Sequence, residues 1–308
     1  MKVSIIGGGG RVGSDAAYAL QLGGIVREIA LVDANADMAA GEALDLLHGA
    51  ALTSSQTIVS SGGYDVVDGS DCVVITAGLR RKPDESRLEL INRNVGLFRQ
   101  ILDSVKGAKL NDGATILVVS NPVDILTYLA IDSGILPSAQ VLGLGTVLDT
   151  CRFRSLLADH YQVGATDVKA LILGEHGDSM VPIWSSATVA GTSVASLPGF
   201  NQAEADAIFE RTKTSGAEVI RLKGGAGRAV GVSIKEVVEA IALDQGRILP
   251  VSAKQSGALG IKNIALSLPT RIGRHGVVEI LEPAVTEAER AGLIKSAESL
   301  TATYAQIS

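Results

Sequence analysis

Aromatic residues are scarce in this chain of 308 residues, where Phe, Trp and Tyr together make up 3%. Proteins that bind bases or sugars by stacking present several aromatic side chains, so that class is disfavoured. Lys and Arg number 27 against 33 Asp and Glu, which gives a net charge of −6 and a pI near 5.3. Domains that bind nucleic acid are usually basic, so we expect no nucleic-acid partner.

Cysteine is also rare, and the sequence has no long apolar run. Cys72 and Cys151 both lie among apolar residues, so we expect two buried free thiols, a reducing compartment and a cytoplasmic protein. No segment approaches the roughly 18 uninterrupted apolar residues that a membrane helix needs, and "MKVSIIGGGG" suits a strand better than a signal peptide. We expect no membrane partner and no metal site.

Hydrophobic residues make up 46% of the chain, enough for a sizeable core, and their pattern divides it into two parts. The first part alternates short apolar runs with amphipathic segments, which predicts a doubly wound parallel sheet of Rossmann type. The expected strands are 3–6, 28–32, 57–60, 72–76, 115–119 and 141–144, and the expected helices include 13–22, 36–48 and 87–105. This domain should span residues 1–145.

The second part, residues 146–308, should form an α+β catalytic domain with antiparallel strands. Helices are expected at 149–161, after Asn201, after a Ser233–Glu236 capping box, and after a Thr286–Glu289 capping box. A strand is expected at 168–173, and an antiparallel set at 248–252, 264–268 and 277–281. No flexible linker separates the two parts, so we expect them to pack closely.

A glycine loop near the N-terminus predicts dinucleotide binding. In "KVSIIGGGGRVGSDAAYAL", Gly8, Gly10 and Gly13 fit G-x-G-x-x-G, and Gly7 offers a second spacing. Such glycines allow a tight turn and a close approach of the backbone to a pyrophosphate at a helix N-terminus. Asp33 ends the next strand, where an acid binds the ribose diol and disfavours a 2′-phosphate. The pattern favours NAD; the alternative is a glycine turn with Asp33 as a cap.

A second feature is the cationic stretch "LRRKPDESR", residues 79–87, between a buried strand and a helix. Ser86 and Glu89 form a capping box, so the helix should begin at Arg87, where a cation opposes the helix dipole. A cation in that place is poor for stability but suited to binding an anion. The alternative is a solvated charged loop.

Two further groups of residues are candidates for chemistry. Asp149 and Arg152 lie at i and i+3 in a predicted helix, a spacing that more often means a surface ion pair. His176 lies between Gly174 and Gly177 in "GEHGD" at a strand end, where small neighbours admit a ligand. The other three histidines lack this setting, but spacing does not show that His176 meets Asp149.

These motifs in this order resemble the lactate/malate dehydrogenase family over essentially the whole chain. The matching stretches are the glycine loop, "LVD", "ITAG", "RRKPDESR", "RNV", "VSNPVD", "GLGTVLDTCRFR" and "GEHGD". Within the family, the sequence is most similar to malate dehydrogenases built like lactate dehydrogenases.

The resemblance implies a role for each matching residue. His176 would exchange a proton with the substrate and Asp149 would orient it. Arg152 would bind the C1 carboxylate, Arg87 would polarise the reacting carbonyl, and Arg81 would bind a second carboxylate. Contacts with NAD are implied for a further set: Gly7, Gly8, Gly10, Arg11, Val12, Gly13, Asp33, Thr76, Ala77, Gly78, Asn94, Val119 and Asn121, the last also holding substrate.

The expected activity is therefore reversible, NAD-dependent oxidation of malate to oxaloacetate, a reaction of the tricarboxylic acid cycle. A lactate or broader 2-hydroxyacid dehydrogenase is the first alternative, and a non-catalytic dinucleotide-binding protein is the second. Asp84 in place of a common glycine, Ala226 in place of a common Thr or Ser, and Arg80 beside Arg81 depart from the family pattern. The family also implies a homo-oligomer, a tetramer or a dimer, for which the helices in 40–50 and 237–246 offer apolar faces.

Overall fold

The computed structural model describes residues 1–53, 56–80, 82 and 84–307. A large sheet forms its centre, and the predicted parallel strands are confirmed in order β6-β5-β4-β1-β2-β3. These strands are β1 (Lys2–Ile6), β2 (Glu28–Val32), β3 (Ile58–Gly62), β4 (Cys72–Ile75), β5 (Thr115–Val118) and β6 (Val141–Gly143). Most are apolar and buried on both faces because helices cover the two sides of a parallel sheet.

The sheet does not stop at the predicted domain boundary. β11 (Ser252–Ser256) and β12 (Lys262–Ser267) come from the second half and extend it antiparallel beyond β6. The close packing of the two halves is thus a shared sheet. The division at residue 145 stays a prediction.

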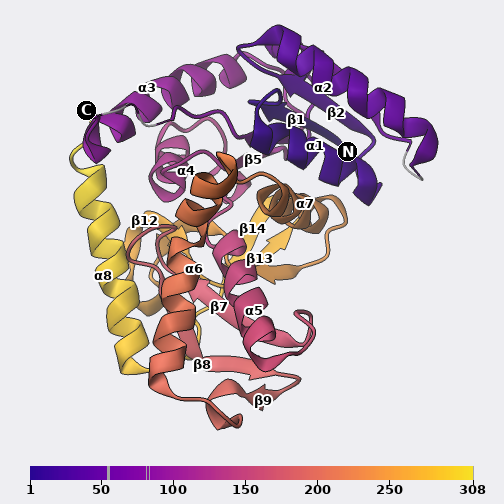
Figure 1. Cartoon of the computed structure of the whole chain (residues 1–308). Coiled ribbons are helices and arrows are strands. Elements are labelled where there is room, and N and C mark those ends of the chain that lie inside the picture. The colour runs from indigo at the N-terminus through magenta and orange to yellow at the C-terminus, as the bar shows by residue number, and fades with distance from the viewer. Residues whose placement is uncertain (54–55, 81, 83, 308) are drawn as a thin grey trace.

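Helices α1 (Arg11–Gly23), α2 (Ala36–Gly49), α3 (Arg87–Lys106) and α4 (Val123–Asp132) connect the parallel strands. Helix α7 (Arg228–Ala242) comes from the second half and lies against α1 (Figure 1). A Cβ at Gly231 of α7 would lie 2.6 Å from the carbonyl oxygen of Asp15 in α1, so only glycine permits this close contact. Ile234, Val237 and Ile241 of α7 then share one hydrophobic cluster with α1.

The second half is built around two small antiparallel sheets. One contains β7 (Val168–Leu173), β8 (Val181–Val189) and β9 (Thr192–Ser193), and the other contains β10 (Arg247–Leu249), β13 (Thr270–Gly273) and β14 (Gly276–Ile280). Helices α5 (Val147–Tyr161), α6 (Gln202–Lys223) and α8 (Glu287–Tyr304) surround them, and α8 runs along one edge of the molecule toward α3 (Figure 1). Single turns of 3₁₀ helix complete the described elements: η1 (Ala50–Leu52), η2 (Tyr64–Val67), η3 (Ser138–Gln140), η4 (Val194–Ser196) and η5 (Ala258–Gly260).

Three local predictions were wrong. Ser233 does not cap a helix, because α7 begins earlier, at Arg228, and the Ser233 hydroxyl donates to the Ala229 carbonyl inside it. The strands expected at 264–268 and 277–281 pair antiparallel as predicted, but they do not form one set, since the first falls in the large sheet and the second in a small one. Cys151 is exposed, whereas Cys72 is buried as expected. The errors in sheet membership and in the burial of Cys151 share one cause, because local pattern does not show which neighbour an element meets.

The capping boxes at Ser86–Glu89 and Thr286–Glu289 are confirmed by reciprocal hydrogen bonds, and Asn201 caps α6 as predicted. Within the described residues, no helix combines the length and apolar character that a membrane span requires.

Candidate active site

The glycine loop joins β1 to α1 and leaves an open cradle at the helix N-terminus. Gly7 has a φ of +91°, a conformation that favours glycine. A Cβ at Gly13 would lie 2.2 Å from the Gly7 carbonyl oxygen, so this turn is incompatible with a side chain there. Gly10 precedes α1 without any side-chain cap, which leaves helix N–H groups free for an anion. The residues present fit a pyrophosphate.

Asp33 follows β2 and faces this loop. Its carboxylate accepts hydrogen bonds from the Gly9 amide at 3.0 Å and the Asn35 amide at 2.9 Å. Carboxylate oxygens accept more than one hydrogen bond each. Asp33 therefore both braces the loop and keeps acceptor capacity for a ribose diol, which fits the adenosine half of NAD.

Six further predicted cofactor residues follow the ends of β4 and β5 or lie in the first turn of α1. Thr76 donates its hydroxyl to the Ile6 carbonyl at 3.0 Å, and Ala77 and Gly78 follow it at the end of β4. Val119 and Asn121 follow β5, and Val12 lies in the first turn of α1. Their contacts with NAD stay predictions.

Two of the predicted cofactor residues have protein partners. The side chain of Asn94 is buried. Its Oδ1 accepts a hydrogen bond from the backbone N–H of Leu79 at 2.8 Å, and its Nδ2 donates to the Leu90 carbonyl at 3.0 Å, so Asn94 braces the start of the cationic loop. Arg11 donates from Nη1 to the carbonyls of Lys223 and Gly225, at 2.7 and 2.8 Å. Arg11 thereby joins the glycine loop to the connection between α6 and α7.

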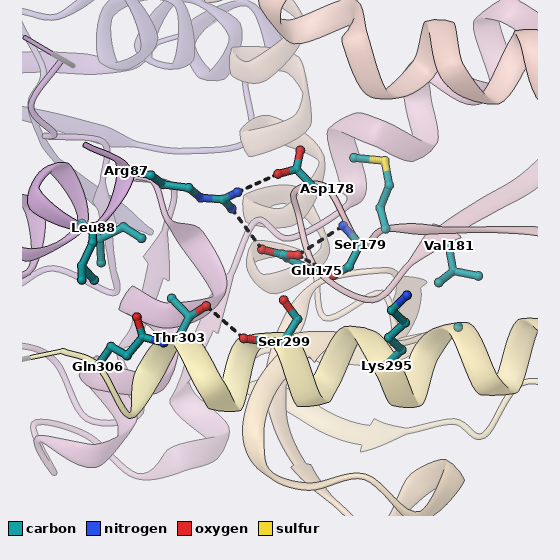
Figure 2. Close-up of a pocket in the computed structure, with 13 residues that line it drawn as sticks. Arg87, Leu88, Glu175, Asp178, Ser179, Val181, Lys295, Ser299, Thr303 and Gln306 are labelled. Atoms are coloured by element: carbon teal, nitrogen blue, oxygen red, sulfur yellow. Dashed lines mark hydrogen bonds and ion pairs between the residues drawn. The ribbon is translucent and has the colours of Figure 1, made fainter. Parts of the chain in front are cut away.

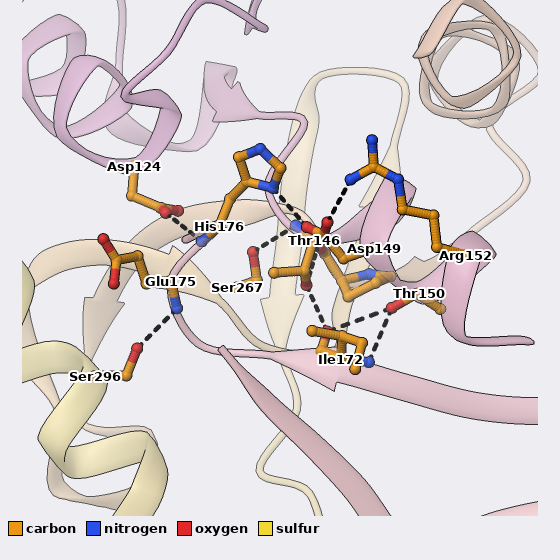
Figure 3. A network of polar contacts seen from close by, with 11 residues as sticks. Asp124, Thr146, Asp149, Thr150, Arg152, Ile172, Glu175, His176, Ser267 and Ser296 are labelled. Atoms are coloured by element: carbon orange, nitrogen blue, oxygen red, sulfur yellow. Dashed lines mark hydrogen bonds and ion pairs between the residues drawn. The ribbon is translucent and has the colours of Figure 1, made fainter. Parts of the chain in front are cut away.

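The structure brings His176, Asp149 and Arg152 together, which spacing alone did not show. Nδ1 of His176 lies 2.5 Å from Oδ2 of Asp149, and Nη1 of Arg152 donates to Oδ1 of the same carboxylate at 3.0 Å (Figure 3). The Asp149 side chain is fully buried, with an exposed fraction of 0%, while Arg152 and His176 retain 17% and 23%. The Asp149–Arg152 pair is thus buried rather than a surface ion pair.

These contacts set the charges of the site. Burial disfavours the anion of Asp149, but the neighbouring His176 and Arg152 outweigh it and lower the pKa of Asp149. Burial by itself would lower the pKa of His176, but the charge and hydrogen bond of Asp149 raise it above the ordinary value. An imidazole with one nitrogen held by a buried carboxylate and a raised pKa can exchange a proton near neutral pH.

Arg87 reaches the same segment from α3. Nη1 of Arg87 pairs with Asp178 at 2.6 Å and Nη2 with Glu175 at 3.6 Å, two carboxylates that flank His176 in sequence (Figure 2). The Arg87 side chain is 65% exposed. Its guanidinium borders a cavity of about 540 Å³ between the start of α3 and helix α8, with Lys295, Ser299 and Thr303 on the α8 side.

The rest of the cationic loop is partly described. Arg81 lies outside the described residues, and Arg80 is exposed. Asp84 has a φ of +61°, in the left-handed region that favours glycine. Glu85 accepts from the Lys82 amide at 2.9 Å and pairs with Arg93 at 2.5 Å, which ties the loop to α3.

Sequence reasoning missed several residues of the site. Asp124, in α4, accepts a hydrogen bond from the His176 amide, and Ser296 of α8 accepts one from the Glu175 amide (Figure 3). A single acid in the apolar stretch "VDILTYLAI" after β5 was the signal for Asp124. Glu175 and Asp178 flank His176 in the motif itself. Among the described residues, no cluster of three or more His, Cys, Asp and Glu could hold a metal ion.

Comparison with known proteins supports the same organisation. Residues 1–143 match the NAD-binding domain of lactate/malate dehydrogenase, and residues 146–308 match the α/β C-terminal domain of that family. L-lactate dehydrogenase 1 of Clostridium acetobutylicum is 42% identical over 304 residues, which cover 97% of this chain and 96% of the relative. L-lactate dehydrogenase B of Hordeum vulgare is 44% identical over 307 residues, or 97% and 88% of the two chains.

A solved structure agrees with these sequence matches. The minor L-lactate dehydrogenase of Enterococcus mundtii, in a ligand-bound form, superposes with a TM-score of 0.95 at 36% identity, covering 100% of this chain and 98% of the other. The protein therefore has the fold of an NAD-dependent dehydrogenase, and its cofactor is NAD.

The expected malate activity and its place in the tricarboxylic acid cycle are corrected by these findings, because the relatives named above are L-lactate dehydrogenases. The error lay in treating loop cations as evidence for a second substrate carboxylate. A protein carboxylate already neutralises one of these cations, since Arg87 pairs with Asp178. A count of cations does not distinguish partners in the protein from partners in a substrate.

Proposed function

Because the chain belongs to the lactate/malate dehydrogenase family, we propose that it is an L-lactate dehydrogenase that interconverts pyruvate and L-lactate with NAD. The observation that carries the proposal is the contact of His176 and Arg152 with the buried carboxylate of Asp149. Relatives that match nearly the whole chain are named L-lactate dehydrogenases, which supports the same proposal.

We assign the following roles to residues of this chain. Arg152 binds the C1 carboxylate of pyruvate, for which its planar guanidinium is suited. The imidazolium of His176 donates a proton to the C2 oxygen during reduction and, when neutral, accepts it during oxidation. Asp149 fixes the ring and stabilises its charged form. Bound NADH supplies the hydride.

Arg87 has a separate role in the proposal. A guanidinium beside the C2 carbonyl polarises it and stabilises the negative charge that develops on oxygen. To do so, Arg87 exchanges its contacts with Asp178 and Glu175 for a contact with the substrate. Asn121, which follows β5, is assigned to hold cofactor and substrate together.

A broader 2-hydroxyacid dehydrogenase is a second candidate, and one observation favours it. The connection between α6 and α7 is Gly224-Gly225-Ala226-Gly227, with no side chain larger than a methyl group, and Arg11 holds it beside the glycine loop. If this connection borders the substrate, longer side chains on the 2-oxo acid would be accepted.

The test is a rate comparison. Oxidation of NADH is measured with pyruvate, 2-oxobutyrate, phenylpyruvate and oxaloacetate under the same conditions, and then with NADPH. The highest kcat/KM is expected for pyruvate with NADH. Higher values for the longer monocarboxylates would select the second candidate, and a preference for oxaloacetate would contradict both.

We further propose that the protein is a homo-oligomer, for which helix α2 offers the better surface. Met38, Leu44 and Leu47 are exposed along it, and Leu52 follows in η1. In α7, by contrast, Val237, Val238 and Ile241 are buried in the core. Exposed apolar side chains grouped on one helix are typical of interfaces. Light scattering should give a mass of two or four chains, and Leu44→Lys should reduce it.

A further inference from the structure

We propose that Asp124 is a second carboxylate of the acid–base site: a positioning residue that holds the backbone of His176 and, as an anion, favours the protonated imidazole. This inference rests on the proposed function, in which His176 exchanges a proton with the substrate. Asp124 acts through His176 and has no assigned contact with the substrate. Asp124 lies in α4, His176 in the turn after β7, and Ser296 in α8 (Figure 3).

The first observation is a direct contact. Oδ2 of Asp124 accepts a hydrogen bond from the backbone amide of His176 at 2.7 Å, across 52 positions of sequence. The adjacent amide of Glu175 donates to the Ser296 hydroxyl of α8 at 2.8 Å. The turn that carries His176 begins at Gly174, which has a φ of +87°. The two hydrogen bonds fix this turn to α8 at Glu175 and to α4 at His176.

The second observation is the setting of Asp124. It lies in the first turn of α4, beside the buried apolar residues Val123 and Ile125, with an exposed fraction of 2%. A carboxylate at a helix N-terminus is favoured by the helix dipole. Removing a carboxylate from water is costly, however, and an uncharged acceptor would satisfy one amide equally well. A buried acid at this place therefore calls for a role that needs its charge.

The third observation is that this carboxylate is incompletely satisfied. Within the described part of the chain, neither Oδ1 of Asp124 nor the buried Ser252 hydroxyl makes a well-formed hydrogen bond. Ser252, in β11, is still close enough to lower the pKa of Asp124. An unpaired buried acceptor costs stability, so stability alone does not account for an acid at this position. The charge of Asp124 lies beside His176 and favours its imidazolium.

The charged groups around the pair give the direction of the effect. Asp149 and Asp124 both favour the imidazolium of His176, and Arg152 opposes it. Glu175 carries the same negative charge as Asp124 and raises the pKa of Asp124. Burial raises the pKa of Asp124 to about 6, against the opposing influence of Ser252 and His176. Asp124 is therefore an anion above roughly that pH, in the range where pyruvate reduction requires protonated His176.

The decisive variant is Asp124→Asn, which keeps an acceptor for the His176 amide and removes the charge. The matched control is Asp132→Asn, the same change at the exposed C-terminal end of α4. The pKa of His176 is read by NMR titration of the imidazole, with His176→Asn used to assign its signal among four histidines. In parallel, kcat/KM for pyruvate is measured against pH.

In Asp124→Asn, the NMR pKa of His176 and the midpoint of the pH profile of kcat/KM should both fall by about 0.5 to 1 pH unit. A nearby opposite charge shifts a pKa by roughly 1 to 3 units, and Asp149 remains in the variant. Asp132→Asn should leave both values unchanged. A loss of activity without any shift would mean that Asp124 has only a structural role, and would overturn the inference.

Ser252→Ala provides a second variant in case Asp124→Asn does not fold. It removes a group that favours the Asp124 anion, so the NMR pKa of His176 should fall by a smaller amount in the same direction, and an unchanged value would overturn the inference. The NMR titration needs no turnover. A wild-type protein inactive on pyruvate would therefore count against the proposed function alone, whereas an unmoved His176 titration would count against Asp124.

Discussion

Oδ2 of Asp149 lies 2.5 Å from Nδ1 of His176, although the two residues are 27 positions apart on different elements. Asp149 comes from α5, and His176 follows β7, which packs against α5. The contact involves one ring nitrogen of His176, which in our proposal leaves the other for the substrate. It also joins His176 to Arg152 through one carboxylate, so the groups that we propose to exchange the proton and to bind the anion are positioned together.

Replacing His176 with Asn should separate chemistry from cofactor binding. We expect kcat for pyruvate reduction to fall by about 10²- to 10⁴-fold, the usual contribution of a general acid, because the variant has no proton to donate. NADH binding, measured by fluorescence titration, should change by less than about twofold, because His176 is not among the cradle residues. Near-normal turnover would remove His176 from its proposed role.

The raised pKa of His176 predicts opposite pH dependences for the two directions. Reduction of pyruvate requires the protonated ring, so its kcat/KM should be highest at low pH and decline as pH rises through the pKa of His176. Oxidation of lactate requires the neutral ring and should rise through the same pH. Because Asp149 raises this pKa, both transitions should occur above the pH at which an unperturbed histidine titrates, about 6.5. A shared transition below that value would contradict the assignment.

Arg152→Lys tests whether the guanidinium fork is needed. Lysine keeps the charge but loses the paired donors, so kcat/KM for pyruvate should fall by about 10- to 100-fold, since a hydrogen bond to a charged group contributes roughly 1.5–3 kcal/mol. The loss should appear chiefly in KM. Arg154→Lys, two positions later in α5, is the matched control and should have little effect on KM. Equal effects of the two substitutions would indicate a general disturbance of α5.

Asp178→Asn should release Arg87. The Arg87–Asp178 pair is exposed and competes with the proposed contact to substrate, so we expect KM for pyruvate to fall by about two- to fivefold, in line with the modest energy of exposed ion pairs. Wild-type KM should approach that of the variant at high salt, which screens the pair. Asp65→Asn, an exposed acid in the cofactor half, is the control. A higher KM in Asp178→Asn would show that the pair supports binding instead.

Gly13→Ala should disturb the cradle. The added Cβ would meet the Gly7 carbonyl oxygen at 2.2 Å and the Gly8 Cα at 2.8 Å, both backbone atoms. We expect a loss of about 1–3 kcal/mol in the free energy of unfolding, as for other overpacked sites, and an increase in the Kd for NADH. Gly41→Ala in α2 is the matched control, because its Cβ would meet nothing within 4 Å. It should stabilise the helix by about 0.5–1 kcal/mol. Similar effects of both changes would contradict the steric argument.

Much of the nucleotide-binding half could be predicted because its signals are local. Strands buried on both faces are continuous apolar runs, so β2 was predicted over its observed range, Glu28–Val32. A capping box is defined within four residues, so the start of α3 at Arg87 was also readable. Ser233 shows the limit of such local signals. Its Ser-x-x-Glu pattern lies inside α7, which begins earlier, at Arg228.

The sequence alone determined the alternation of strands and helices, the glycine cradle, the candidate residues His176, Asp149 and Arg152, and the family. Only the tertiary structure decided that one carboxylate joins His176 to Arg152, that Asp124 contacts the His176 amide, and that Arg87 pairs with Asp178 across 91 positions. It also decided that β11 and β12 complete the first sheet. The physical reason is that periodicity and capping record interactions within a few residues, whereas these contacts form only when separate elements pack and exclude water between them.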